Sequence, residues 1–256
     1  MRAETHGANY GGIDPSRSDG KKTVVVEPIV QIGLFHLAEK HDDPFGSLTR
    51  AISKHANIAR SLLVLPEAFN YGGVYHDNPP RGPTFASEET LQFLEGITRQ
   101  HDTIIVVSVL EGKANRAYLV DKGGRRPMGY KSHEDSCAVD NPLETRGLSI
   151  GALICSDAQT LTYYRPVIDR IDQSSCARKV ICVPASMSQD TFNGPDFPLP
   201  QYDGKYFILA NSKDPPGESC GSFFANNRKK LGGKSFNDRH NAIHLTTWSE
   251  LDQLGA

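Results

Sequence analysis

The sequence predicts an α/β protein in which helices and strands form layers around one buried core. Apolar, β-branched segments alternate along the chain with segments whose apolar residues recur at helical spacing. Most of the strand-like segments are apolar at nearly every position, which is typical of strands covered on both faces. We therefore expect one domain over residues 23–256, preceded by a flexible polar leader over residues 1–22.

The expected strands are short apolar runs bounded by Gly, Pro and polar residues. They cover residues 23–35, 62–69, 103–112, 115–124, 147–157, 179–186 and 204–212, with weaker candidates at 220–228 and 241–248. The expected helices cover residues 43–61 and 87–101, which have amphipathic spacing, and the part of residues 164–177 that follows Pro166. Gly and Pro punctuate residues 70–85, which predicts a loop, and the polar residues 125–136 are expected to be exposed.

The composition excludes several classes of protein. Hydrophobic residues make up 38% of the chain, charged residues 23%, and the formal net charge is -2. This balance does not favour binding to nucleic acid or to an anionic membrane surface. The apolar runs are far shorter than the roughly 20 residues that span a bilayer, and the polar N-terminal segment lacks the apolar stretch of a secretory signal. We expect a cytoplasmic protein whose partner is a small molecule.

The five cysteines are Cys137, Cys155, Cys176, Cys182 and Cys220. Their number is odd, their spacing is irregular, and no Cys/His group has the spacing of a zinc site. We therefore expect reduced thiols and no bound metal. A free cysteine is usually a small buried hydrophobic residue, so chemistry at any one of them needs support from its surroundings.

Three polar residues lie at or just past the carboxyl ends of apolar segments. Glu67 closes "LLVLPE", Lys131 follows "MGY", and Cys155 closes "SIGALIC". Open α/β sheets bind ligands at the carboxyl ends of their strands, so a mostly parallel sheet would gather these residues on one edge. Taken singly, each has an ordinary interpretation as a solvated strand end, a surface lysine or a core cysteine, but together they form a chemically complete set.

A carboxylate, an ammonium group and a thiol can act together in nucleophilic catalysis. The attacking species is the thiolate, which a nearby lysine favours, and a carboxylate can take the thiol proton as general base. The Lys131 ammonium group can then stabilise the oxyanion that forms when sulfur attacks a carbonyl or nitrile carbon. If the chain turns into a helix after Cys155, the backbone N–H of Ser156 is the natural second donor.

The segments "LLVLPEAFNYGG", "GYKSH" and "LSIGALICSD" resemble the three signature segments of the nitrilase superfamily, the carbon–nitrogen hydrolases. The strand-like segments before, between and after them are similar to those of the family in the same order, from about residue 24 to 226. The resemblance implies a four-layer αββα sandwich. It also implies hydrolysis of a non-peptide carbon–nitrogen bond, in an amide or nitrile, through a cysteine thioester and without a cofactor. It further implies that the chain forms a homodimer.

Carried over residue by residue, the resemblance makes Glu67 the general acid/base, Lys131 the stabiliser of the transition state and Cys155 the nucleophile. Many family members have a second glutamate between the lysine and the cysteine. Here the segment is short, and Glu134 and Glu144 are the candidates.

Residues that flank the expected edges of the site are candidates for the substrate pocket, namely Phe69, Tyr71 and Met187. The unusual loops leave a second interpretation open, in which the fold is a catalytically inactive binding or sensory module. A third interpretation pairs Cys155 with His133 as a Cys–His hydrolase, and it leaves the lysine unexplained.

Overall fold

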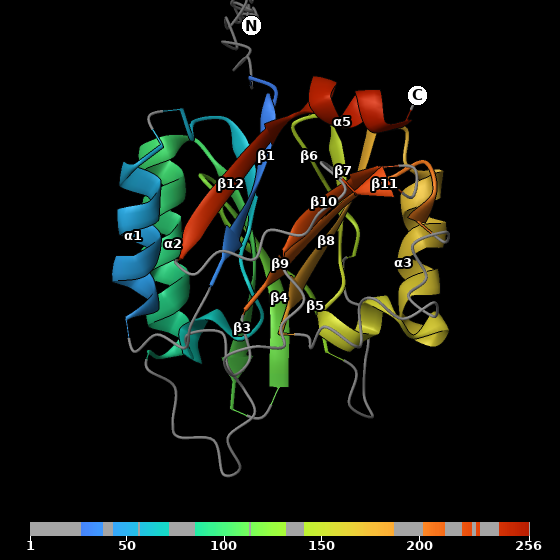
Figure 1. Ribbon diagram of the computed structural model, residues 1–256. Coiled ribbons are helices and arrows are strands. Elements are labelled where there is room, and N and C mark those ends of the chain that lie inside the picture. Colours follow the sequence, from blue (N-terminus) through green and yellow to red (C-terminus); the bar gives the residue numbers. More distant parts are fainter. Residues whose placement is uncertain are drawn as a thin grey trace, which may run out of the picture.

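The computed structural model describes residues 27–37, 43–55, 57–71, 85–112, 114–131, 141–186, 202–212, 222–226, 229–230 and 241–255. Two six-stranded sheets pack face to face, with helices on both outer sides (Figure 1). This arrangement of four layers is the αββα sandwich that the resemblance implies. Within the described residues, no helix is both long and apolar enough to cross a membrane.

The first sheet has the strand order β12-β1-β2-β3-β4-β5. Its strands are β12 (Ala242–Thr247), β1 (Gln31–His36), β2 (Ser61–Val64), β3 (Ile104–Glu111), β4 (Ala114–Asp121) and β5 (Gly124–Tyr130). β1, β2 and β3 are parallel, while β4 is antiparallel to both β3 and β5. The strands β2, β3 and β5 therefore all end at the same edge of the sheet.

The second sheet has the strand order β11-β10-β9-β8-β7-β6. Its strands are β11 (Lys229–Lys230), β10 (Phe223–Asn226), β9 (Tyr206–Asn211), β8 (Arg178–Ala185), β7 (Leu148–Ala152) and β6 (Leu143–Thr145). The central strands β7, β8 and β9 are parallel. The Glu67 N–H donates to the Ala185 carbonyl at the end of β8 (3.3 Å), so the carboxyl ends of β2 and β8 meet at one edge of the sandwich.

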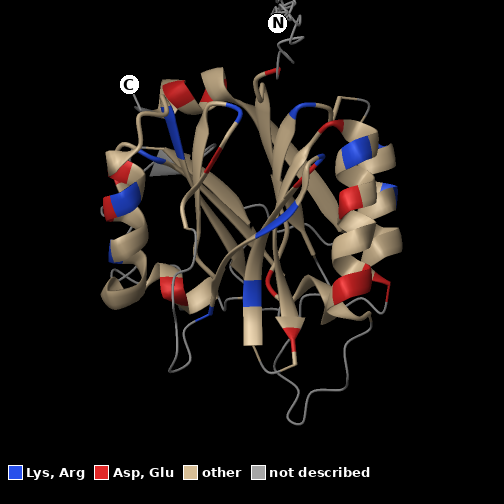
Figure 2. Ribbon diagram, turned by 180° about the vertical axis from the view of Figure 1, so that it is seen from behind, with Lys and Arg blue, Asp and Glu red and all other residues tan. Residues whose placement is uncertain are grey.

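Apolar helix faces cover the outer side of each sheet. The helices are α1 (Pro44–Ser53), α2 (Ser87–His101), α3 (Leu161–Gln173) and α5 (Trp248–Gly255), with short 3₁₀ helices η1 (Phe69–Tyr71) and η2 (Cys155–Ala158). α1 and α2 cover the first sheet and α3 covers the second (Figure 1). Their outer faces carry bands of acidic and basic residues (Figure 2), as amphipathic helices on a sandwich require.

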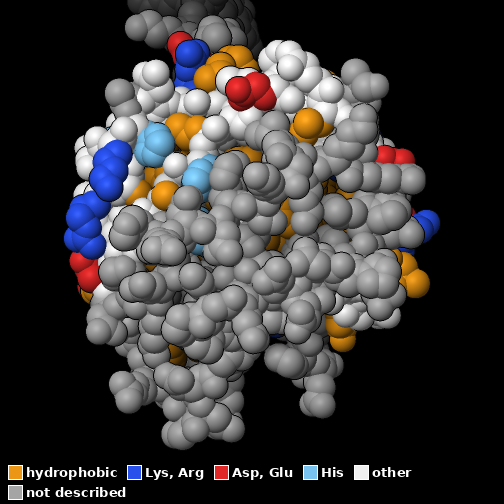
Figure 3. Space-filling view, in the orientation of Figure 1, with side chains coloured by type: hydrophobic (Ala, Val, Ile, Leu, Met, Phe, Trp, Pro, Cys, Tyr) orange, Lys and Arg blue, Asp and Glu red, His pale blue; other side chains and the backbone are white. Residues whose placement is uncertain are grey.

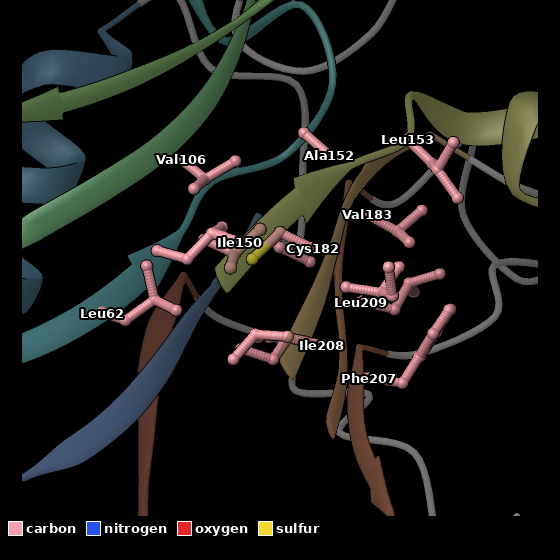
Figure 4. Close-up of a cluster of buried hydrophobic side chains, with 14 of the residues drawn as sticks. Leu62, Val106, Ile150, Ala152, Leu153, Cys182, Val183, Phe207, Ile208 and Leu209 are labelled. Atoms are coloured by element: carbon pink, nitrogen blue, oxygen red, sulfur yellow. The ribbon is translucent and has the colours of Figure 1, made fainter. Parts of the chain in front are cut away.

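The core between the sheets is apolar and contains one of the cysteines. Leu62 and Val106 of the first sheet point toward Ile150, Cys182 and Ile208 of the second (Figure 4). Adjacent residues on the second sheet, including Val183 and Leu209, point to the opposite side, where α3 packs. Since strand side chains alternate between faces, strands apolar at every position fill both layers of this core.

Helix α3 packs closely on β7, and this explains a glycine in the middle of the strand. A Cβ atom on Gly151 would lie 2.8 Å from a methyl group of Val167 and 3.1 Å from Ile181. β7 is thus held tightly against α3. This packing fixes the end of β7, from which the chain continues to Cys155.

Several expectations for single elements are wrong. Residues 125–136 were expected to be exposed, but Gly124–Tyr130 form β5, in which Met128 is buried. The expected helix over 43–61 ends at Ser53, and Ile58 reaches the core from the following turn. α3 begins at Leu161 and contains Pro166, whereas the helix was expected to begin only after this proline.

An ion pair between a buried arginine and a partly exposed aspartate links the β6–β7 turn to the end of α2. The Arg146 side chain is 4% exposed and donates to the Asp102 carboxylate at 2.7 Å and to its carbonyl at 3.2 Å. Hydrogen bonding to Arg146, assisted by Lys122, lowers the pKa of Asp102. The Asp102 carboxylate therefore stabilises the fold in its charged form.

Replacing Arg146 by alanine is expected to lower the free energy of unfolding by about 2 kcal/mol, because two hydrogen bonds to a partly screened charged group are lost. A depressed carboxyl pKa contributes stability above the unfolded-state value of about 4, and this is lost as pH falls through the folded-state value. The difference between wild type and variant should therefore shrink below about pH 4 in urea titrations. Arg99→Ala removes an exposed ion pair with Glu95 and serves as the control with little effect. A pH-independent difference would contradict this account.

Candidate active site

The structure brings Glu67, Lys131 and Cys155 together at one edge of the sandwich. Glu67 lies three residues past β2, Lys131 directly follows β5, and Cys155 lies three residues past β7. The Lys131 Nζ donates to the Glu67 Oε1 at 2.6 Å. The Glu67 side chain is 2% exposed and that of Lys131 is 17% exposed, so the ion pair lies largely out of water.

The backbone has an unusual conformation beside Glu67 and at Cys155. Cys155 has φ 52° and Ala68, next to Glu67, has φ 49°. Residues other than glycine rarely adopt this left-handed conformation, and such strain is concentrated at functional sites. At Cys155, three residues after the end of β7, the chain enters η2.

The thiol of Cys155 is buried and protonated at neutral pH. Burial and the nearby negative charge of Glu67 raise its pKa well above the ordinary range, while Lys131 acts in the opposite direction. Its Sγ lies 3.6 Å from the Ser186 carbonyl oxygen, to which the thiol donates. The expectation that a nearby lysine favours the thiolate thus holds for that single interaction, but burial and Glu67 outweigh it.

The ammonium group of Lys131 stays charged in the same site. Burial alone would lower its pKa, but the charge of Glu67 raises it, and the hydrogen bond to Glu67 and the charge of Asp157 act in the same direction. Asp157 is 5% exposed and lies two residues after Cys155. A permanent cation therefore lies beside a neutral thiol and a carboxylate, which is a suitable arrangement for moving a proton and stabilising a new negative charge.

A hydrogen-bond network that the sequence interpretation missed surrounds Glu67. The Asn115 Nδ2 donates to the Glu67 Oε1 at 2.8 Å, and the Asn115 carbonyl accepts from the Lys131 N–H at 2.8 Å. Ser108 donates to the Asn115 Oδ1. The sequence shows these as two polar residues in buried strands, in "VVSVL" and "ANRAYLV", on the neighbouring antiparallel strands β3 and β4, where Asn115 is paired with Leu110 and Ser108 with Ala117.

A pocket of about 90 Å³ lies between β5, the end of β7 and the start of α3, and Glu67, Lys131 and Cys155 are not among the residues that line it. Its lining includes Tyr130, which precedes Lys131, together with Ile154 and Asp157 on either side of Cys155. Its walls are completed by Thr162 and other residues in the first turns of α3. The pocket is thus lined by chain neighbours of Lys131 and Cys155 and not by these residues themselves.

The remaining site candidates lie in different surroundings. Ser156 is exposed and is the second residue of η2, in the first turn, where the amide groups of a helix have no partner within it. Phe69 is fully buried in the core beneath α1 and α2, where its ring packs edge-on against Phe35 at a centroid distance of 6.3 Å, and it is not among the residues that line the 90 Å³ pocket. Tyr71 ends η1 and is partly exposed.

Neither candidate for a second glutamate is placed beside Cys155 by the structure. Glu144 is exposed on β6, and its carboxylate accepts from Ser174 at the end of α3 remote from η2. Glu134, His133 and Met187 lie outside the described residues. Within the described part of the chain, no group of three His, Cys, Asp or Glu side chains could hold a metal ion.

The chain is therefore an αββα sandwich protein in which a glutamate, a lysine and a cysteine lie together where strands of both sheets end. The sequence profile of the carbon–nitrogen hydrolase family matches residues 29–169, which is more than half of the chain. The chain therefore belongs to the carbon–nitrogen hydrolase family, the nitrilase superfamily. Comparison with curated protein sequences gives no match.

Solved structures of an amidase from Nesterenkonia sp. have a similar fold. The amidase itself is 17% identical with a TM-score of 0.60, covering 86% of this chain and 90% of that chain. A variant of it in complex with butyramide has the same identity and TM-score, covering 88% of this chain and 94% of that chain. In a glutamate-to-glutamine variant, also 17% identical, acrylamide has added to the active site cysteine, with a TM-score of 0.60 and coverage of 85% and 92%.

Proposed function

We propose that this protein hydrolyses the amide bond of small molecules through a thioester on Cys155. The observation that carries the proposal is the buried Lys131–Glu67 ion pair, 2.6 Å long, beside a buried thiol. An ion pair in this position is costly to bury for stability alone, so a catalytic role explains why it is there. The butyramide and acrylamide complexes of the Nesterenkonia amidase support amides as the substrate class.

In the first half of the proposed reaction, Glu67 accepts the thiol proton as Sγ attacks the carbonyl carbon. The new oxyanion is held by the Lys131 Nζ and the Ser156 N–H. The carboxylic acid of Glu67 then donates its proton to the leaving nitrogen, the carbon–nitrogen bond breaks, and the thioester and free amine remain. The raised pKa of Cys155 makes this route reasonable, because a neutral thiol needs a base at the moment of attack.

In the second half, Glu67 accepts a proton from water as the water oxygen attacks the thioester carbon. The tetrahedral intermediate collapses, the carbon–sulfur bond breaks, and the Cys155 sulfur regains a proton from Glu67. The released product is the carboxylic acid. Lys131 remains charged throughout, in agreement with its raised pKa.

The thioester is the species that tests this proposal. Incubation of the wild-type protein with butyramide and hydroxylamine is expected to yield the hydroxamate, and acid quenching should leave a butyryl group on the Cys155 peptide in mass spectrometry. Release of ammonia from butyramide measures complete turnover. Tight binding of aliphatic amides without ammonia, hydroxamate or adduct would contradict hydrolysis and support the alternative of an inactive binding module.

A further inference from the structure

Asn115 contacts both charged residues of the candidate active site. Its side-chain Nδ2 donates to the Glu67 Oε1, and its carbonyl accepts from the Lys131 N–H. Asn115 is 6% exposed and Ser108, on the neighbouring strand β3, is fully buried. Buried polar groups of this kind are costly unless they are hydrogen-bonded, so their bonds restrict how the site can be arranged.

The hydrogen bonds around Asn115 form a chain that begins and ends at adjacent residues. The Ala68 N–H donates to the Ser108 Oγ at 3.4 Å, and the Ser108 hydroxyl donates to the Asn115 Oδ1. The Asn115 Nδ2 then donates to Glu67, the residue before Ala68. Because Ser108 supplies its proton to Oδ1, the amide of Asn115 has its NH₂ group directed at the carboxylate.

We propose that Ser108 and Asn115 are positioning residues, which hold the Glu67 carboxylate in line with the Cys155 thiol. Both Lys131 and Asn115 donate to the same oxygen, Oε1, so Oε2 is left to accept the thiol proton. Ser108 acts only through Asn115, by keeping its amide in one of two orientations. This inference rests on the proposed function, because it assigns the residues that align the general base.

Substitution of Ser108 and Asn115 tests the alignment directly. Ser108→Ala is expected to lower kcat about 10-fold and Asn115→Ala about 100-fold, with KM for butyramide within about twofold of wild type. Ser149→Ala is the matched control, because Ser149 is also fully buried on a strand and its Oγ has no hydrogen-bond partner among the described residues. Its kcat should equal that of wild type.

The double variant distinguishes positioning from general destabilisation. If Ser108 acts through Asn115, the variant that carries both substitutions should be no slower than Asn115→Ala alone. Two losses that multiply in the double variant, or an unchanged kcat in both single variants, would overturn the proposal. A fall in thermal stability alone would also contradict it, because stability does not depend on alignment of the base.

The rate at which Cys155 is alkylated tests the positioning role without requiring that the protein hydrolyses an amide. In Asn115→Ala the Glu67 charge still lies near Sγ but is no longer held in line with the thiol, so labelling by iodoacetamide at neutral pH should slow about 10-fold. If the wild-type protein hydrolyses no amide but Asn115→Ala slows labelling, only the proposed function fails. If butyramide is hydrolysed and labelling and kcat are unchanged in Asn115→Ala, only the positioning role fails.

Discussion

Replacement of Cys155 by alanine is expected to abolish butyramide hydrolysis, with kcat reduced at least about 10⁴-fold. The covalent step requires a nucleophile at this position, and no water molecule activated by Glu67 gains the same proximity to the carbonyl carbon. The fold should survive, because alanine removes a single buried atom and the residue keeps the same left-handed backbone conformation. Such a substitution typically costs about 1 kcal/mol.

The matched control for this prediction is Cys182→Ala. Cys182 is also buried, but it points into the core between the sheets, toward Leu62 and Val106 (Figure 4). Its substitution should lower the melting temperature by a few degrees and leave kcat unchanged. Ammonia release and thermal melting, measured on both variants, separate the chemical role from packing. Residual turnover in Cys155→Ala above one per cent of wild type would contradict a thioester mechanism.

The edge that carries the candidate active site could be predicted from the sequence, because the composition changes from apolar to polar where a strand ends. An apolar run stops at Glu67 and another stops at Cys155, and parallel strands bring such ends to one edge. The layered α/β class follows from the same alternation of apolar strands with amphipathic helices, whereas the order of the four layers came from the family resemblance. These features depend on local patterns, which a single sequence displays.

Features that depend on the partner of a residue could not be predicted in this way. β5 is the edge strand of its sheet, and an edge strand tolerates Pro127 and two arginines that obscure its pattern. An apolar residue such as Phe69 suits a core and a pocket wall equally well, and the sequence does not show that it packs against Phe35. The proposed role of Asn115 depends on its hydrogen bond to Glu67, which lies 48 residues away in sequence.

The exposed hydrophobic residues of the described part do not indicate where a partner would bind. The large hydrophobic residues that are exposed in the described part are Val30 and Leu161, at 40% and 58%. On the face shown in Figure 3, hydrophobic side chains occur in small groups among polar ones. Such scattered groups are normal for a protein surface and do not by themselves identify an interface. The homodimer implied by the family resemblance therefore stays a prediction.

Replacement of Glu67 by glutamine is expected to reduce butyramide turnover at least about 10³-fold while leaving the thiol reactive. Glutamine has the same shape, but it can neither accept the thiol proton nor protonate the leaving nitrogen. The negative charge of Glu67 is one cause of the raised pKa of Cys155, and Lys131 acts in the opposite direction. In the variant the pKa of Cys155 should therefore fall, although burial still raises it.

The variant thus separates two properties that normally change together. Labelling of Cys155 by iodoacetamide should persist in Glu67→Gln, and its pH profile should move to lower pH than in wild type, because Lys131 now faces the thiolate without a competing carboxylate. Glu111→Gln is the control, since Glu111 is a partly buried carboxylate on β3 that accepts from Tyr118 and makes no contact with the cluster. Its turnover and labelling should match wild type.

A Glu67→Gln variant that retains a tenth of wild-type turnover, or whose labelling profile does not move, would show that Glu67 is not the base. In that case the proton must leave Cys155 by another route, and the 2.6 Å ion pair would be a structural feature of the edge.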